Sequence, residues 1–185
     1  AIEPLDVRVL ERLRANEADM AFFPATELPP DFHSLRIYRS KKGILVRDGH
    51  PVIEAYEKAG VMTWELLNRW PAVCVTAGMK DGGAKSVEGR RVGVVLPYFL
   101  TVPYVVARTD FTFEGPLITL RRFMMDSQFQ FRILPMPEES GPFEPRLVWH
   151  HCSHTDPFLQ WVRGLVVDAA RSEARLLGVI DTSEE

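Results

Sequence analysis

The chain has 185 residues, 22 lysines and arginines against 25 aspartates and glutamates, and a formal net charge of −3. This length suits one domain or two small lobes, and the 46% of hydrophobic residues can form a core without disulfides or metal ions. The absence of a basic excess argues against nucleic-acid binding by this segment alone. Glycine and proline interrupt its longest apolar stretch, residues 92–106, which excludes a membrane span there.

The first predicted elements are a helix and a strand. Asp6 can cap a helix of apolar residues at helical spacing, and Asn16 can end it, because asparagine tolerates the left-handed conformation. Residues 20–23 are apolar throughout, which predicts a strand buried on both faces of a parallel sheet. Residues 35–46 predict one long strand or two shorter ones. The basic cluster at 39–42 is either an anion site or a solvated turn, and the turn is favoured.

Helices and strands continue to alternate through the middle of the chain. A second helix is expected from Thr63 until Pro71 ends it, followed by a buried strand at 73–75. Residues 76–85 are glycine-rich and predict a mobile loop, and they lack the Gly-Lys-Ser/Thr ending of a phosphate-binding loop. The remaining predicted elements here are strands at 91–96, 131–134 and 147–150 and helices at 98–108 and 117–125.

The last helix is the clearest element, with Asp156 as its N-cap and Pro157 as its first residue. We expect its apolar face to pack on the rest of the domain, with Arg163 pointing away. The alternation of strands and helices along the chain favours an α/β fold with mainly parallel sheets. The predicted packing face consists of Phe158, Trp161, Val162, Leu165, Val166 and Ala169.

Potential ligands cluster in one segment, at His150, His151, Cys152 and His154. A zinc site usually takes its ligands from two separated knuckles, and only one is present, so a surface loop is the favoured interpretation. Nucleophilic catalysis is not supported either, because no serine lies in a Gly-x-Ser-x-Gly elbow and Cys74 lies in an apolar run. We therefore expect no enzymatic activity, no cofactor and no metal ion.

The points where strands lead into helices are better candidates for a binding site. In open α/β sheets ligands collect beyond the carboxyl ends of the strands, where helix N–H groups favour an anion. Tyr98 and Thr101 offer hydroxyl groups and Phe99 offers an aromatic face, which together suit a small aromatic acid. Alternatively, Tyr98 and Phe99 are only packing residues. The candidate ligand-binding residues are Phe23, Pro24, Ala25, Thr76, Tyr98, Phe99 and Thr101.

Five segments, in order, resemble the effector-binding domain of LysR-type transcriptional regulators. Residues 17–22, Glu-Ala-Asp-Met-Ala-Phe, are similar to that family's "GxxDLAI" signature, and residues 46–51 to its strand ending in His-Pro. Residues 109–116 resemble its "TDLIATLP" segment, and residues 27–33, Glu-Leu-Pro-Pro-Asp-Phe-His, the branch that senses aromatic compounds or nodulation flavonoids. The closing "LVWH…DP…WLR" pattern is similar to Leu147–His150, Asp156-Pro157 and Trp161–Arg163.

The resemblance implies two Rossmann-like lobes in a periplasmic-binding-protein-like plan, joined by two crossover segments. Lobe I would comprise residues 1–57 and 146–185, lacking its first strand and helix, and lobe II residues 58–145. The expected ligand is an aromatic or other organic acid, bound in the cleft between the lobes. The family also implies self-association to a dimer or tetramer, a cytoplasmic location away from any membrane, and DNA binding through an N-terminal helix-turn-helix domain that this sequence lacks.

Two departures from the family pattern bear on the site that the resemblance implies. Phe23 stands where the aromatic-sensing branch often has glycine, which would narrow the cleft. Glu114 replaces a more apolar residue, and its charge would disfavour a carboxylate ligand unless the side chain points away. The main alternative function is a solute-binding protein of a transport system, and a third is a hydrolase or metalloenzyme that uses the segment at 150–154.

Overall fold

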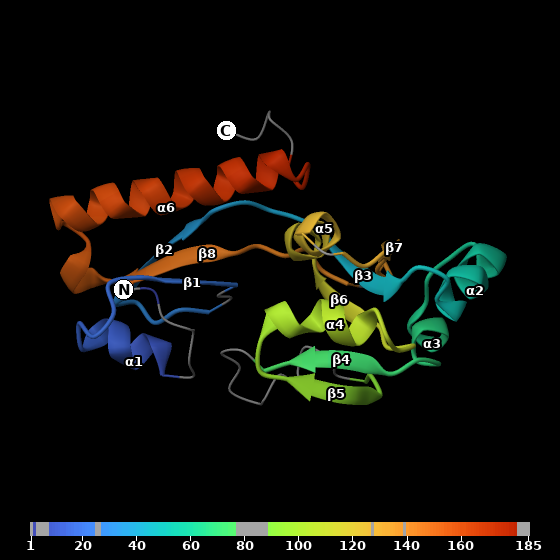
Figure 1. Ribbon diagram of the computed structural model, residues 1–185. Coiled ribbons are helices and arrows are strands. Elements are labelled where there is room, and N and C mark those ends of the chain that lie inside the picture. Colours follow the sequence, from blue (N-terminus) through green and yellow to red (C-terminus); the bar gives the residue numbers. More distant parts are fainter. Residues whose placement is uncertain are drawn as a thin grey trace. The chain divides into compact units, whose positions relative to one another are not determined.

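The structure, a computed structural model, describes residue 2 and residues 8–24, 27–76, 89–126, 128–138 and 140–180 (Figure 1). Asp6, Ala25 and nearly all of the expected glycine-rich loop lie outside the described residues. The chain divides into two compact units, unit 1 (Ala1–Pro4 and Lys41–Gly141) and unit 2 (Leu5–Ser40 and Pro142–Glu185). The chain therefore passes between the units near residues 40 and 141, whereas the sequence analysis expected boundaries at 57 and 145.

Unit 2 contains a three-stranded sheet. Strands β1 (Ala21–Phe23) and β2 (Phe32–Arg36) both pair antiparallel with β8 (Arg146–His150), which lies between them. Helix α1 (Val9–Arg14) ends where predicted, with Asn16 at a φ of 55°. The short 3-10 helix η3 (His151–Ser153) leads from β8 to the long helix α6 (Pro157–Leu176), which Figure 1 shows alongside β2 and β8.

Unit 1 is built around β3 (Lys42–Arg47), which lies between β6 (Phe113–Pro116) and β7 (Phe131–Pro135) and runs antiparallel to both. Strand β4 (Ala72–Val75) pairs in parallel with β5 (Val92–Leu96). The first residue of β4 also forms a parallel bridge with Thr112, just before β6. The helices of this unit are α2 (Pro51–Ala59), α3 (Trp64–Leu67), η2 (Phe99–Thr101), α4 (Val102–Val106) and α5 (Leu117–Asp126).

The core of unit 1 explains why residues 41–57 belong to it. Successive side chains of a strand point to opposite faces, and both faces of β3 are buried. Leu45 packs in a cluster with Val102 of α4 and residues of α5, while Ile44 packs in a second cluster with Val52 of α2 and Leu67 of α3. Strand β3 is thus the centre of two hydrophobic layers, and α2 covers one of them.

Helix α2 was not predicted from the sequence, although its end signals are present. The Nδ1 atom of His50 accepts a hydrogen bond from the N–H of Val52 at 3.0 Å and so caps the helix, and Pro51 occupies its first position. Gly60 ends it in the left-handed conformation, with a φ of 72°. The His-Pro dipeptide was interpreted as the end of a strand, and it is also the start of a helix.

The expectation of mainly parallel sheets is wrong for the described strands. Apart from the single parallel bridge between Ala72 and Thr112, only β4 and β5 pair in parallel, whereas every pairing made by β3 and β8 is antiparallel. Each of these two strands is the first after the chain passes into its unit, and no helical crossover precedes it, so the parallel βαβ rule does not apply. Phe22 in β1 is also exposed, so that strand is not buried on both faces.

The predicted packing face of α6 is only partly correct, because Val162 and Val166 are half-buried but other members of the face are exposed. Phe158 and Trp161 are 65% and 62% exposed, whereas Arg163, predicted to point away, is buried together with Val167. The guanidinium of Arg163 donates hydrogen bonds to backbone carbonyls and lies 4.6 Å from the centre of the Trp149 ring. The amphipathic pattern did not reveal these polar contacts. None of the helices in the described ranges is long and apolar enough to cross a membrane.

Candidate functional site

Four predicted ligand-binding residues, Thr76, Tyr98, Phe99 and Thr101, lie at one edge of unit 1. Thr76 directly follows β4, and its N–H donates to the carbonyl of Leu96 at the end of β5, at 3.0 Å. Tyr98 comes two residues after β5, and the hydroxyl of Thr101 donates to its carbonyl at 2.7 Å. Because β4 and β5 are parallel, their carboxyl ends meet at the same edge, as the sequence analysis supposed.

The aromatic residues at this edge are open to solvent to different degrees. Tyr98 is 61% exposed. Phe99 is partly exposed, and its ring meets the ring of the buried Phe113 edge-on, with 6.1 Å between centroids. Phe99 therefore packs on the core with one side and presents the other, while most of the Tyr98 side chain is available for contact with a ligand.

The expected helix at 98–108 is shorter than predicted. It consists of the 3-10 turn η2 and the five-residue helix α4, and the buried Pro103 lies in the first turn of α4. The N–H of Thr101 is already engaged by the carbonyl of Tyr98 at 3.3 Å. An anion at this edge would therefore gain little from a helix dipole, which grows with the number of aligned peptides. Hydroxyl groups and the aromatic side chains remain the chemistry available here.

The other predicted residues belong to unit 2. Phe23 is the last residue of β1, and it is partly buried against the cluster that contains Leu13 and Val148. Pro24 follows it and is exposed, and Ala25 lies outside the described residues. Phe23 is thus committed in part to the core of its own unit.

The carboxylate of Glu114 is paired with an arginine side chain. It accepts a hydrogen bond of 2.5 Å from Nε of Arg90, and the two side chains are 8% and 1% exposed. The same guanidinium donates to Oγ1 of Thr112 at 2.7 Å and to Oδ1 of Asn68 at 2.6 Å. The expected repulsion between Glu114 and a carboxylate ligand is therefore offset by Arg90. Sequence reasoning missed this arginine, because nothing in the local sequence pairs it with a residue 24 positions later.

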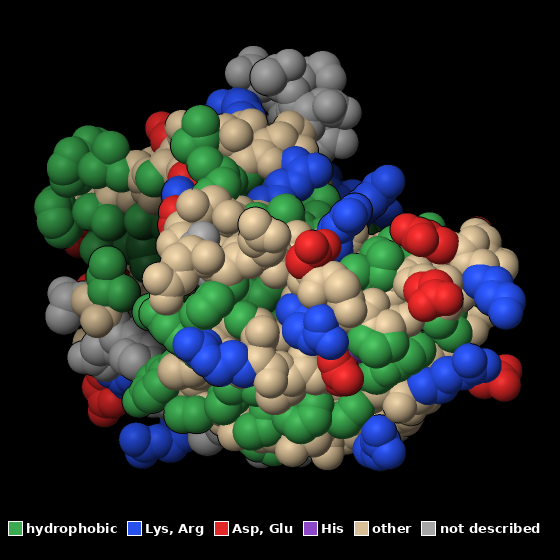
Figure 2. Space-filling view, turned by 45° about the vertical axis from the view of Figure 1, so that its right-hand side comes forward, with side chains coloured by type: hydrophobic (Ala, Val, Ile, Leu, Met, Phe, Trp, Pro, Cys, Tyr) green, Lys and Arg blue, Asp and Glu red, His purple; other side chains and the backbone are tan. Residues whose placement is uncertain are grey.

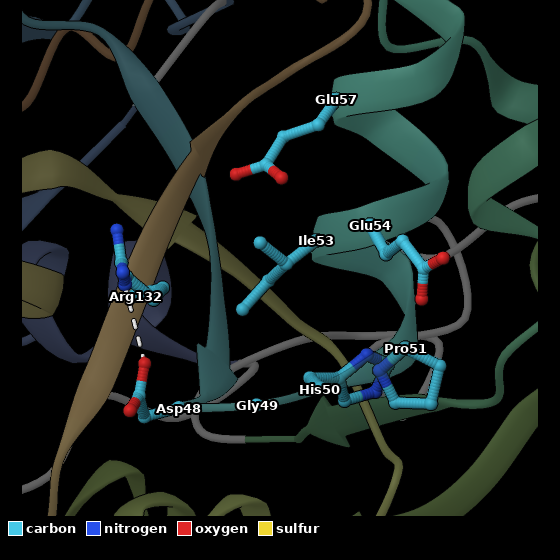
Figure 3. A pocket seen from close by; sticks show the side chains of 8 residues that line it. All are labelled: Asp48, Gly49, His50, Pro51, Ile53, Glu54, Glu57 and Arg132. Carbon is cyan, nitrogen blue, oxygen red and sulfur yellow. Dashed lines mark hydrogen bonds and ion pairs between the residues drawn. The ribbon is translucent and has the colours of Figure 1, made fainter.

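A surface hollow of about 330 Å³ lies elsewhere in unit 1, beside helix α2. Figure 3 shows Glu57 and Ile53 of α2 pointing toward the strand that carries Arg132, whose Nε donates to Asp48 at 3.2 Å. None of its lining residues was predicted to bind a ligand. The full lining is Asp48, Gly49, His50, Pro51, Ile53, Glu54, Glu57 and Arg132.

His50, one of the residues that line this hollow, is almost fully buried. Its Nδ1 accepts the capping hydrogen bond of α2, and its Nε2 makes no hydrogen bond to the described residues. Burial lowers the pKa of His50, and the backbone of Asp110 raises it in part. We interpret His50 as the helix cap of α2, because that contact explains its position.

The histidine–cysteine segment lies in unit 2 and makes pairwise contacts. Nδ1 of His150 is 3.0 Å from the sulfur of Cys152, and its Nε2 is 3.3 Å from Asp31. His151 and His154 turn instead toward His33 of β2, which sequence reasoning missed because it lies more than 100 residues earlier. Among the described residues, no three of these side chains converge on a point where a metal ion could be held.

Charged side chains are mixed in sign over the face of the molecule in Figure 2, where acidic and basic groups are interspersed. The basic cluster at 39–42 is engaged in local contacts: Arg39 pairs with Glu144 at 3.3 Å, and Lys41 accepts a backbone hydrogen bond from Leu117. The pairing of Arg39 argues against an anion site, but the segment is not a turn, because Ser40 forms an antiparallel bridge with Phe143 and Lys42 begins β3.

Comparison with known proteins gives one consistent family. The family model described as "LysR substrate binding domain" matches residues 5–171. The transcriptional regulator SyrM of Rhizobium meliloti is 31% identical over 175 residues, which cover 91% of this chain and 52% of SyrM. SyrM 1 of Sinorhizobium fredii is 27% identical over 169 residues, covering 87% of this chain and 48% of its own length. The chain thus spans about half the length of the curated relatives it matches.

Solved structures match the same fold. The regulatory domain of MexT, a transcriptional activator in Pseudomonas aeruginosa, aligns with a TM-score of 0.66 at 22% identity, covering 85% of this chain and 77% of that one. The effector binding domain of QuiR, solved in complex with shikimate, aligns with a TM-score of 0.66 at 11% identity, covering 91% of this chain and 79% of that one. At these identities the likeness establishes a shared fold.

Proposed function

The chain belongs to the LysR substrate-binding domain family, as an effector-binding regulatory domain, and on that premise we propose that its effector is a small aromatic or other organic acid. The observation that carries this proposal is the edge of unit 1 where Thr76, Tyr98 and Thr101 come together at the ends of two parallel strands. The family match also favours a regulator over a transport protein.

The chemistry of this edge supports the class of ligand. The Tyr98 ring is largely exposed and Phe99 is exposed on one side, so an apolar ring can lie against them. The hydroxyl group of Tyr98 can donate to a carboxylate, whereas that of Thr101 already donates to the Tyr98 carbonyl. The Glu114 charge is balanced by Arg90. Shikimate, the compound named in the QuiR structure, is likewise a small carboxylic acid.

We further propose how binding would act on transcription. The effector is held between the two units, with Phe23, Pro24 and Ala25 contributing from unit 2. Binding favours one relative angle of the units over others, and a ligand can shift such an equilibrium only by its difference in affinity for the two states. In the whole protein this change is passed to a DNA-binding domain within a cytoplasmic dimer or tetramer.

The test is calorimetry of the full-length protein with a panel of aromatic and aliphatic acids. Tyr98→Ala and Phe99→Ala should each weaken binding of a responsive acid by about tenfold, which corresponds to about 1.4 kcal/mol. Leu100→Ala is the matched control, since Leu100 lies in the same turn, is 78% exposed and is not a candidate contact. No response across the panel, or equal affinities in all three variants, would count against the proposal.

A further inference from the structure

A ladder of stacked rings joins three parts of unit 2. His33 of β2 stacks on His154 with 3.9 Å between ring centroids and 13° between planes. The Trp149 ring of β8 is almost parallel to His154, at 4°, with 6.1 Å between centroids. His151 extends the ladder, because its Nδ1 lies 2.9 Å from Nε2 of His33. We call these four residues the ring ladder.

The hydrogen bonds of the ring ladder limit how many protons its imidazoles can carry. Nε1 of Trp149 donates to Nδ1 of His154 at 3.2 Å, so that nitrogen must be unprotonated. The facing nitrogens of His33 and His151 can share a hydrogen bond only if one of them lacks a proton. Protonation of His154, or of both His33 and His151, therefore removes a contact and places positive charge inside the stack.

The surroundings of the ring ladder do not compensate that charge. From α6, the guanidinium of Arg163 lies over Trp149. From the end of β8, His150 and Cys152 contact each other. Two carboxylates in the described part of unit 2 are engaged elsewhere: Asp31 with Arg14 of α1 at 2.5 Å and with His150, and Asp156 as the cap of α6 through the N–H of Leu159.

The ring ladder also holds the start of α6. Arg163 donates to the carbonyls of Ser153 at 3.2 Å and His154 at 2.9 Å, and the side-chain amide of Gln160 donates to the same His154 carbonyl at 3.1 Å. The first two turns of α6 are therefore fixed to the turn whose imidazole stacks on β2. Loss of the stack would free this turn and the helix start that it anchors.

We propose that the ring ladder is an acid-sensitive latch, which holds the N-terminal end of α6 to the sheet at neutral pH and releases it when its imidazoles take up protons. This device is independent of effector binding and adds a second input to the domain. The exposed Phe158 and Trp161 lie in the released turns, so acid changes the mobility of an apolar surface.

The direction of the pH effect follows from linkage. Burial first, and then the neighbouring His154, His151 and Arg163, lower the pKa of His33. At His33 the folded state therefore binds fewer protons than the unfolded state, in which a histidine titrates near pH 6.5. Stability is lost as the pH falls below that value, and the loss levels off below the lowered pKa.

Hydrogen exchange of the chain between pH 8 and pH 5, corrected for intrinsic rates, tests the latch. We expect protection at residues 157–163 to fall with acid, and the melting midpoint of unit 2 to fall by roughly 5 °C. The triple variant His33→Gln, His151→Gln, His154→Gln should lose this pH dependence. His150→Gln is the control, because His150 lies in the same segment but outside the stack, and it should retain the dependence.

Three results would overturn the latch. One is unchanged protection of residues 157–163 from pH 8 to pH 5 in the unaltered chain, a measurement that needs no variant and decides the question if the triple variant does not fold. The second is a folded triple variant with the same pH dependence as the unaltered chain. The third is loss of the dependence in His150→Gln alone, which would assign the effect to the pair with Asp31.

Discussion

The buried ion pair of unit 1 allows a sharp test of what holds the candidate site in place. We expect Arg90→Met to destabilise the chain by about 3–5 kcal/mol, because it leaves the carboxylate of Glu114 buried without its partner. The magnitude follows from the burial of both side chains, at 1% and 8% exposure, and from the short contact of 2.5 Å. Thr112, which is fully buried, loses its 2.7 Å hydrogen bond as well.

Urea unfolding followed by circular dichroism measures this loss of unfolding free energy, and a double variant completes a double-mutant cycle. Arg90→Met with Glu114→Leu removes both charges, and we expect it to recover most of the loss, since two apolar side chains of similar volume avoid the desolvation penalty. The matched control is the exposed pair Arg122 and Asp126 of α5, at 3.4 Å with 41% and 61% exposure. Asp126→Asn there should cost less than about 0.5 kcal/mol.

The reasoning would be refuted by either of two outcomes. A cost of Arg90→Met below about 1 kcal/mol would mean that Glu114 finds water or another partner, so that the pair is not closed to solvent. A double variant that is no more stable than Arg90→Met would mean that the guanidinium acts through its shape and its hydrogen bonds to Thr112 and Asn68, and not through charge.

Two further predictions concern packing and pH. Gly43→Ala should lower the free energy of unfolding by about 1–3 kcal/mol, because the new Cβ would lie 2.9 Å from Cγ2 of Ile133. Gly164→Ala in α6 has open space around it and should raise the free energy of unfolding by about 0.5–1 kcal/mol. Thermal unfolding of both variants measures the difference. Arg14 lowers the pKa of Asp31 to about 2, so the contribution of this carboxylate is present above its unfolded value near 3.9 and lost as the pH falls through about 2. Carboxyl titration by NMR should show that pKa rising toward its ordinary value in Arg14→Met.

Local signals in the sequence predicted several element boundaries, although the helix that begins after Thr63 ends at Leu67 and not, as predicted, at Pro71. Asp156 caps α6 through a hydrogen bond of 2.9 Å to the N–H of Leu159, and Pro157 is its first residue. Thr63 caps α3 in the same way, through the N–H of Leu66 at 3.1 Å. These contacts span three residues, so a short stretch of sequence is enough to identify them.

The parts of the site that depend on distant contacts could not be predicted. Thr76 and Tyr98 were proposed because both follow strands, and the structure does bring them to one edge. The pairing of Arg90 with Glu114 and the stacking of His33 on His154 join residues 24 and 121 positions apart, and no local pattern distinguishes those partners from other charged or aromatic residues. Arg163 shows the same limit, since its buried position depends on carbonyls in the preceding turn.

The strands that are antiparallel to their neighbours show why the burial of a strand was easier to predict than its direction. Ile44, Leu45 and Val46 of β3 are completely buried, and Val148 of β8 is as well. Both strands are paired on both edges, which leaves successive side chains to pack on opposite faces of the sheet. A run of apolar residues therefore indicates a central strand, whether the strand is parallel or antiparallel to its neighbours. The direction of a strand changes which backbone groups form hydrogen bonds, but it does not change which side chains are buried. The direction of a strand depends instead on the segment that connects it to the preceding strand of the sheet. No crossover helix precedes β3 or β8, so strand direction has to be predicted from the connection and not from the strand itself.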